Sequence, residues 1–160
     1  MTRITIRDAK FPDDAPQLAR LFRDYVEWLG VDLGFQDFEA ELAGLPGKYA
    51  PPGGCALLAE VTGGRAIGCV AMRPLRGDIC EMKRLYLRPD ARGTGLGRRL
   101  AENVIRAARQ AGYRRMVLDT LDHMQGALRL YDRLGFQQIP PYYHNPMPGA
   151  VYLGRDLDPV

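Results

Sequence analysis

The stretch that decides the fold is Glu81-Met-Lys-Arg-Leu-Tyr-Leu-Arg-Pro-Asp-Ala-Arg-Gly-Thr-Gly-Leu-Gly97. Residues 79–87 are rich in apolar and β-prone side chains, and this composition predicts a strand. Pro89 ends the strand, because proline has no N–H for a ladder hydrogen bond and disfavours helix for the residue before it. Three alternate glycines then lead into an apolar stripe at helical spacing. The sequence therefore predicts a strand, a tight loop and the start of a helix.

The glycine loop has the features of an anion-binding site. Glycines let the backbone approach a ligand closely, and the first N–H groups of a helix have no partner within the helix. Those N–H groups and the helix dipole favour an anion, which is usually a phosphate. Arg92, Arg98 and Arg99 add more positive charge than a plain turn needs. An ordinary glycine turn is the alternative explanation for the run.

Two other phosphate-binding motifs fit this loop poorly. A P-loop has four residues between its glycines and then Lys-Ser/Thr, whereas these glycines alternate. The dinucleotide-binding fingerprint has its third glycine one residue later and an acidic residue about 20 positions further on. Asp119 lies near that distance, but the loop sits in mid-chain after two earlier predicted strands. A Rossmann-like nucleotide enzyme is therefore a secondary alternative.

Two blocks of sequence resemble a known family. Arg92-Gly-Thr-Gly-Leu-Gly97, preceded by Leu85-Tyr-Leu87, resembles the acetyl-CoA signature of the GNAT N-acetyltransferases, Arg/Gln-x-x-Gly-x-Gly/Ala. Ala127-Leu-Arg-Leu-Tyr-Asp-Arg-Leu-Gly-Phe136 is similar to the late helix and following strand of that family. The resemblance covers nearly the whole chain. It implies one acetyltransferase domain over residues 1–160, of the α+β class, with a mixed, mostly antiparallel sheet and helices on both faces.

The resemblance also implies how acetyl-CoA is held as cosubstrate. The loop would bind the diphosphate, and backbone groups of Leu85 and Leu87 would pair with the pantetheine arm, leaving an amide aimed at the thioester oxygen. Met124 stands where many relatives carry an asparagine, so an apolar contact with the arm is expected there. The expected cofactor-binding residues are Leu85, Tyr86, Leu87, Arg92, Gly93, Thr94, Gly95, Leu96, Gly97, Arg98, Met124 and Ala127.

Tyr131 and Glu81 are the expected catalytic residues. The family places a tyrosine at position 131, and its ordinary pKa of about 10 lies above the 8.5 or so of a thiol, so it can protonate the leaving thiolate. Its alternative role is core packing. Glu81 is the candidate base on an apolar strand, and its alternative role is an ion pair with Lys83 or Arg84. A histidine, His123 or His144, and a water molecule are the rival bases.

Three aromatic residues are candidates for the acceptor site. Tyr142 and Tyr143 belong to the proline-stiffened segment 140–148, where loop residues of the scaffold usually set specificity. Trp28, with Phe35, belongs to the region that covers the substrate in the family. Core packing, or a merely rigid loop, is the alternative for each. The acceptor is expected to be the amine of a small molecule or a peptide, and its identity stays open.

Composition excludes several other classes of protein. The chain of 160 residues has 46% apolar and 26% charged residues, which is typical of one globular domain. The net charge of +3 suits a phosphate-bearing cofactor, but no stripe of aromatic residues accompanies it as nucleic-acid binding would require. No apolar run approaches the roughly 18 residues that span a membrane, and the N-terminus is too polar for a signal peptide. We therefore expect neither nucleic acid nor membrane as a partner.

The three cysteines indicate a reducing compartment. Cys55, Cys69 and Cys80 are odd in number and unclustered, so we expect reduced core thiols in a cytoplasmic protein and no metal site. None of them stands where a nucleophile for a ping-pong reaction is obvious. The expected function is acetyl transfer from acetyl-CoA to an amine by direct attack, with a non-catalytic acyl-CoA-binding module as the alternative. Whether the chain forms a homodimer is left open.

Hydrophobic periodicity predicts the order strand, helix, helix, three strands, helix, strand, helix, two strands. An aspartate near Pro12 is expected to cap the first helix, which should end at Gly30. The later elements are expected at residues 37–45 (helix), 55–61, 65–72 and 79–87 (strands), 96–111 (helix), 115–119 (strand), 124–134 (helix), and 136–139 and 150–157 (strands).

Overall fold

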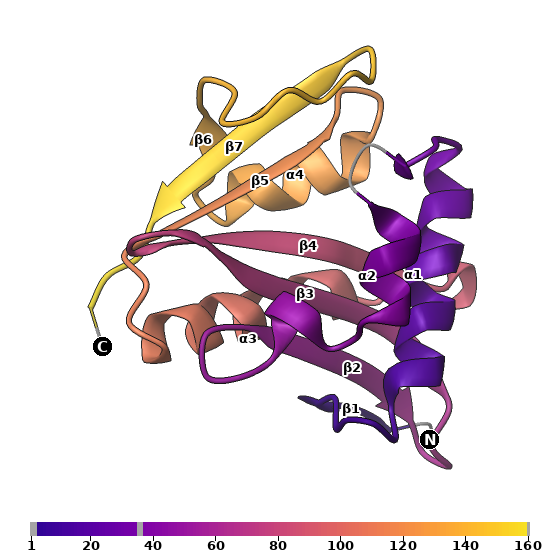
Figure 1. The fold of residues 1–160 in the computed structure, drawn as a ribbon. Helices are drawn as coiled ribbons and strands as arrows, with labels where there is room; N and C mark the ends of the chain where they lie inside the picture. Colours follow the sequence, from indigo (N-terminus) through magenta and orange to yellow (C-terminus); the bar gives the residue numbers. More distant parts are fainter. Residues whose placement is uncertain (1–2, 35–36, 160) are drawn as a thin grey trace.

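A computed structural model describes residues 3–34 and 37–159, and these form a seven-stranded sheet with helices on both faces (Figure 1). The strands are β1 (Ile4–Asp8), β2 (Cys55–Val61), β3 (Ala66–Arg76), β4 (Ile79–Leu87), β5 (Arg115–Leu121), β6 (Gln137–Gln138) and β7 (Ala150–Asp156). The helices are α1 (Ala15–Leu29), α2 (Phe38–Ala43), α3 (Leu96–Gln110) and α4 (Gln125–Arg133), with short 3-10 turns at Gly47–Tyr49 and Pro89–Ala91. The predicted order of elements is confirmed. Strand β3 runs four residues beyond the expected end at Met72, and β6 is shorter than expected.

The strands follow the order β1-β2-β3-β4-β5-β7-β6, and each neighbouring pair is antiparallel except β4 and β5. One hydrophobic core lies between the sheet and α3 and α4, and the other lies between the sheet and α1 and α2. Strand β3 is buried from Ala66 to Met72, since it faces helices on both sides. The predicted mixed, mostly antiparallel α+β sheet is confirmed.

Strand β4 contains a β-bulge that reverses the alternation of its side chains. Cys69 of β3 pairs with Tyr86 of β4, and Ala71 pairs with Lys83. Over this interval β4 therefore contains one residue more than β3. Arg84, inside the bulge, has a positive φ of 61°. Met82 packs in the α3 side core, whereas Tyr86 packs in the α1 side core. The bulge therefore turns consecutive charged residues of β4 toward the side of the sheet covered by α1.

The parallel pair β4 and β5 separates after three residue pairs. Only Ile79, Cys80 and Glu81 pair with β5, at Arg115, Met116 and Val117. Both strands continue beyond this point and diverge, which opens a gap in the middle of the sheet (Figure 1). Everything described below as a candidate site lies around this gap.

Two local expectations need correction. Asp14 occupies the N-cap position of α1, but its carboxylate makes no capping bond to the helix backbone. It accepts two hydrogen bonds from Arg7, at 2.6 and 2.9 Å, and one from the Lys10 N–H at 2.7 Å, so the N-terminus of the helix is held to β1. Helix α2 is also shorter than expected. None of the helices in the described residues is both long and apolar enough to cross a bilayer.

Gly68 allows β3 to approach the end of β4, and its replacement tests this packing. A Cβ at position 68 would lie 2.8 Å from Leu87 Cδ2 and 3.0 Å from the Tyr86 carbonyl oxygen. We expect Gly68→Ala to lower the free energy of unfolding by about 1–3 kcal/mol in urea denaturation, because the core is overpacked. In the control Gly53→Ala the nearest atom lies at 3.6 Å, so little change is expected. Equal stabilities for the two variants would contradict the tight fit.

Candidate active site

The loop between β4 and α3 has the backbone shape that its glycines predict. After the 3-10 turn at Pro89–Ala91, Gly93 and Gly95 have φ values of 77° and 80°, which side-chain-bearing residues rarely adopt. Thr94 Oγ donates a hydrogen bond of 2.7 Å to the Ala91 carbonyl and fixes the turn. The loop is therefore a rigid connection that places the beginning of α3 beside the gap between β4 and β5.

The N-terminus of α3 is strongly electropositive. The first helical hydrogen bond joins Arg99 N–H to the Gly95 carbonyl at 3.2 Å, so the preceding N–H groups point out of the helix end. The first turn carries no acidic residue, but it carries Arg98 and Arg99. Because a helix N-terminus already favours negative charge, arginines there strengthen a field that suits an anion such as a diphosphate.

The end of β4 directs backbone groups into the gap. Arg88 N–H donates to the Ile67 carbonyl at 2.8 Å, so the backbone groups of residue 88 face β3. Backbone direction alternates along a strand, so those of Leu87 and Leu85 face the opposite side, toward β5. Arg92 Nε donates to the Leu87 carbonyl at 3.1 Å, in agreement with this orientation. An extended ligand arm in the gap would meet the same groups.

A long groove joins the glycine loop to α4 and to the last turn of α1. The groove has a volume of about 460 Å³ and is partly open to solvent. Ten of the twelve expected cofactor-binding residues line it: Leu85, Tyr86, Leu87, Arg92, Gly93, Gly95, Gly97, Arg98, Met124 and Ala127. Thr94 turns its hydroxyl to Ala91, and the Leu96 side chain is buried in the core, so these two can contribute only backbone groups.

Trp28, which was expected at the acceptor site, lines this groove and does not line the smaller cavity described below. The guanidinium of Arg92 stacks 4.6 Å from the centre of the Trp28 ring and 5.6 Å from that of Tyr86. Trp28 therefore holds a loop arginine beside the groove, although 43% of it is exposed. Phe35, the other aromatic residue expected here, lies outside the described residues.

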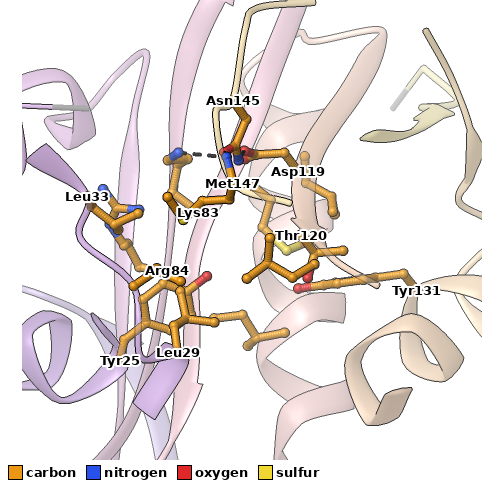
Figure 2. Close-up of a pocket in the computed structure, with 15 residues that line it drawn as sticks. Tyr25, Leu29, Leu33, Lys83, Arg84, Asp119, Thr120, Tyr131, Asn145 and Met147 are labelled. Carbon is orange, nitrogen blue, oxygen red and sulfur yellow. Dashed lines mark hydrogen bonds and ion pairs between the residues drawn. The ribbon is translucent and has the colours of Figure 1, made fainter. Parts of the chain in front are cut away.

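A second, smaller cavity of about 50 Å³ lies between α1, β4, β5 and the segment around residue 145 (Figure 2). It is lined by Tyr25, Leu29, Val31, Leu33, Met82, Lys83, Arg84, Leu85, Leu118, Asp119, Thr120, Leu121, Tyr131, Asn145 and Met147. Five residues line both this cavity and the groove: Tyr25, Leu29, Leu85, Thr120 and Tyr131. The two spaces therefore meet at these residues, where a group bound in one can contact a group bound in the other.

Tyr131 stands at this junction, on α4. The side chain is 7% exposed and packs edge-on against Phe136, with 5.7 Å between the ring centres. Burial raises its pKa above the ordinary value of 10, so the phenol stays protonated at neutral pH. The structure thus gives Tyr131 both a core contact and a place where the groove and the cavity meet.

Glu81 reaches neither the groove nor the cavity. It is 1% exposed, its Oε1 accepts a hydrogen bond of 3.0 Å from Arg73, and its Oε2 accepts one from the Tyr142 hydroxyl. Lys83 Nζ lies 3.9 Å from Oε2. Of the two ion pairs considered for Glu81, the one with Lys83 is present, and Arg84 instead pairs with Glu41 at 3.0 Å.

Tyr142 and Tyr143, the tyrosines of the proline-rich segment 140–148, do not line the cavity either. Tyr143 donates a hydrogen bond to Asp119, as Tyr142 does to Glu81, so the segment is fastened to β5 and β4. Burial raises the pKa of Tyr142 strongly, and the neighbouring Glu81 charge adds to this. Asn145, which donates to Asp119 at 2.9 Å, and Met147 are the residues of the segment that line the cavity.

Sequence reasoning missed the charged residues of the cavity, Lys83, Arg84 and Asp119. Lys83 Nζ lies 3.9 Å from Asp119 Oδ1, and the Lys83 and Arg84 side chains are 4% and 3% exposed (Figure 2). Adjacent lysine and arginine within an otherwise apolar strand were the signal available, because charges are rarely buried without a specific partner. Nothing in the sequence indicated the bulge that turns both residues to one side.

The fold and the two connected spaces define an acyl-CoA-dependent transferase. The sequence profile of the Acetyltransferase (GNAT) family matches residues 16–136. A Schizosaccharomyces pombe protein, uncharacterized N-acetyltransferase C1271.07c, is 45% identical over 98% of this chain and 96% of its own. The chain therefore belongs to the GNAT acetyltransferase family and is an N-acetyltransferase.

Solved structures share the fold. A GNAT-family acetyltransferase from Staphylococcus aureus Mu50 superposes with a TM-score of 0.82 at 18% identity, covering 98% of this chain and all of that one. The Salmonella typhimurium protein yncA, determined with its cofactor acetyl-CoA, superposes with a TM-score of 0.73 at 23% identity and covers 97% of this chain and 94% of its own.

Burial of Lys83 predicts a pH-dependent stability. Desolvation lowers its pKa from 10.5 to about 8, so between these values the unfolded chain binds more protons than the folded chain. The free energy of unfolding of the wild type should therefore rise with pH from 8 to 10, relative to Lys83→Met, by at most about 1.4 kcal/mol per pH unit. Urea denaturation of both proteins at pH 7, 8, 9 and 10 measures this difference. A difference that stays constant with pH would contradict it.

Proposed function

We propose that this protein transfers the acetyl group of acetyl-CoA to the amine of a small molecule by direct attack of the neutral amine. The observation that carries the proposal is the meeting of the groove and the cavity at Leu85, Thr120 and Tyr131. A thioester in the groove and an amine in the cavity would be brought into contact there without a covalent enzyme intermediate.

The groove suits acetyl-CoA along its whole length. The loop amides of residues 93–98 and the guanidinium groups of Arg92 and Arg98 would hold the diphosphate, while Leu85 and Leu87 would pair with the pantetheine arm. Met124 and Ala127 would give the arm an apolar contact. That yncA holds acetyl-CoA in the same fold supports this choice of cosubstrate.

Tyr131 is proposed as the acid of the reaction. When the amine nitrogen bonds to the carbonyl carbon, a strand amide of β4 would stabilise the oxyanion, an interaction typically worth about 3–4 kcal/mol. The carbon–sulfur bond then breaks, and the Tyr131 hydroxyl would give its proton to the thiolate. Glu81 reaches neither space, so we propose that it acts indirectly, by holding Lys83 and Arg73 in place.

Direct attack is supported by the positions of the cysteines. All three are buried and unpaired, and none of the residues described as lining the groove or the cavity is a cysteine. Burial raises the pKa of Cys55 and Cys80 to about 12, so their thiols stay protonated and unreactive at neutral pH. Reduced thiols also support the cytoplasm as the compartment of the protein.

The acceptor is proposed to be small. The cavity of about 50 Å³ equals the space of a few water molecules, since about 10–15 Å³ of such volume holds one water. Asn145 and Met147 close it from the side of the proline-rich segment, which Tyr142 and Tyr143 fasten to the sheet. A peptide N-terminus would need this segment to move, so a small amine is the better fit.

The glycine loop can be tested with coenzyme A alone, measured by isothermal titration calorimetry and by thermal unfolding. Gly95→Ala puts a side chain on a residue with φ of 80° at the start of α3, and we expect it to weaken coenzyme A binding about tenfold or more. Coenzyme A at 100 times its Kd should stabilise the wild type by about 2.7 kcal/mol.

Gly77→Ala is the matched control, because Gly77 has φ of 53° in the β3–β4 turn and lines neither space. Both variants should lose stability, but only Gly95→Ala should lose affinity. Equal affinities for coenzyme A in the two variants would contradict the loop as the diphosphate site.

Tyr131→Phe tests the acid. We expect kcat for thiol release from acetyl-CoA to fall about 100-fold or more, with little change in KM for acetyl-CoA, since the hydroxyl acts only in the transition state. The assay uses a panel of benzylamine, ethanolamine, L-phenylalanine, spermidine and a tetrapeptide.

Tyr113→Phe is the control, because that buried tyrosine donates to the Gly53 carbonyl at 2.6 Å, away from the groove and the cavity. If Tyr131→Phe and Tyr113→Phe had the same kcat, the proposal that Tyr131 is the acid would be wrong. Thiol release that no amine accelerates would remove the transferase function itself.

A further inference from the structure

Lysine is unusually rare in this chain. Of 22 basic residues, only Lys10, Lys48 and Lys83 are lysines, and the others are arginines. Lys10 and Lys48 are exposed, whereas Lys83 is 5% exposed and lines the small cavity. Arg84, the next residue, shows that this strand also accommodates a buried arginine. What distinguishes lysine from arginine at a buried site is that lysine can lose its proton near neutral pH and arginine cannot.

We propose that Lys83, in its neutral form, takes a proton from the ammonium group of the acceptor, and that Asp119 holds that ammonium group before the transfer. This inference rests on the proposed function, because it assumes that an amine occupies the cavity. It assigns the base to Lys83 instead of Glu81, the histidines or water.

The geometry would let an amine bridge the two residues from the side. Lys83 Nζ lies 3.9 Å from Asp119 Oδ1, which exceeds the 2.7–3.2 Å of a direct N–H···O bond. Asp119 Oδ2 accepts from Tyr143 and from Asn145, so the carboxylate is fixed in orientation, with Oδ1 facing Lys83 (Figure 2). A ligand amine that donates to Oδ1 would lie within reach of the Lys83 nitrogen.

The charges around Lys83 favour such an exchange. Around it stand Glu81 and Arg84 from β4, Arg73 from β3 and Asp119 from β5. The neutral hydroxyl groups nearby belong to Tyr142 and Tyr143 of the proline-rich segment and Tyr25 of α1.

Arg73 pairs with Glu81 at 3.0 Å, and Arg84 pairs with Glu41 at the same distance. With Lys83 neutral, the charge of Asp119 is therefore left to attract a cationic amine. Once Lys83 has taken the proton, its own charge balances Asp119, and the amine is left neutral.

The pKa of Lys83 suits this role. Burial lowers it to about 8, and Arg84 and Arg73 lower it too, while Glu81 and Asp119 act in the opposite direction. A base is most effective when its pKa lies near the working pH, and tuned catalytic lysines fall at about 7–8.

The protons balance over the whole reaction. The acceptor R–NH3⁺ gives one proton to Lys83, and its nitrogen then bonds to the acetyl carbon as the carbon–sulfur bond breaks. Tyr131 protonates the thiolate and recovers a proton from the nitrogen, which leaves the amide and free coenzyme A. Lys83 finally releases its proton to solvent, so one proton is produced for each acetyl group transferred.

The first test measures Lys83 without any substrate. With lysine labelled by ¹³C at Cε, the protein gives only three lysine signals, and Lys10 and Lys48 serve as internal references. We expect the Lys83 signal, assigned from its absence in Lys83→Arg, to titrate near pH 8, below the ordinary lysine value of about 10.4. Asp119→Asn should move the Lys83 midpoint to lower pH, because it removes a neighbouring negative charge. A Lys83 midpoint at or above that of Lys48 would overturn the proposal.

The second test measures turnover of benzylamine, or of the fastest amine of the panel named above. In the wild type kcat/KM should fall as the pH drops below 8, since Lys83 becomes protonated. Lys83→Arg keeps a positive charge but cannot accept a proton, so kcat/KM should fall about 100-fold or more, and the pH dependence that remains should follow the pKa of the free amine instead of a midpoint near pH 8. Lys48→Arg, the exposed control, should match the wild type.

A purely structural role for Lys83 predicts the opposite result. Lys83→Arg would then keep the wild-type rate and the wild-type pH profile, and either finding overturns the proposal. Circular dichroism and coenzyme A affinity of Lys83→Arg show whether the variant is folded. The lysine titration measures the pKa of Lys83 whether or not any amine is acetylated. A failure of this inference therefore gives a different result from a failure of the proposed function.

Discussion

The early end of pairing between β4 and β5 is the constraint on which the rest of the site depends. Strand backbone groups are rarely left unpaired inside a protein, yet β4 and β5 pair over three residues only and then diverge. The divergence leaves backbone groups of Leu85 and Leu87 facing an open space in the middle of the sheet. A ligand with amide groups along an extended arm would satisfy these groups, and we propose that acetyl-CoA is that ligand.

The bulge at Arg84 gives this gap two chemically different sides. Before the bulge Met82 packs toward α3, and after it Tyr86 packs toward α1, so Lys83 and Arg84 together face the acceptor side. Two buried cations there require buried anions, which Glu41 of α2, Glu81 of β4 and Asp119 of β5 provide. The hydroxyl groups of Tyr142 and Tyr143 donate hydrogen bonds to Glu81 and Asp119. These bonds hold the proline-rich segment against the sheet. The wall of the cavity is thus a consequence of charge balance around the bulge.

Local signals in the sequence predicted most of the fold and most of the residues that line the groove. Glycine spacing, Pro89 and helical periodicity are short-range features, and they located β4, the loop and α3 correctly. The acceptor side depends on contacts between distant residues, such as Tyr142 with Glu81, which are 61 positions apart. No periodic pattern in the sequence indicates a β-bulge or the point where two strands diverge. Nor does any pattern indicate that Asp14 binds Arg7 instead of capping α1. The contact of Trp28 with Arg92 could not be predicted for the same reason, because only the fold brings the two residues together.

The two residues proposed to transfer protons lie on opposite sides of the sheet. Tyr131 comes from α4 and packs in the core shared with α3, whereas Lys83 faces the side covered by α1 and α2. Acetyl transfer to an amine needs a group that stays protonated beside the sulfur and a group that loses its proton beside the nitrogen. Burial raises the pKa of a tyrosine and lowers that of a lysine, so one desolvated junction sets both groups in the required states. Under the proposed mechanism, burial around the gap would therefore set the protonation states of both the acid and the base.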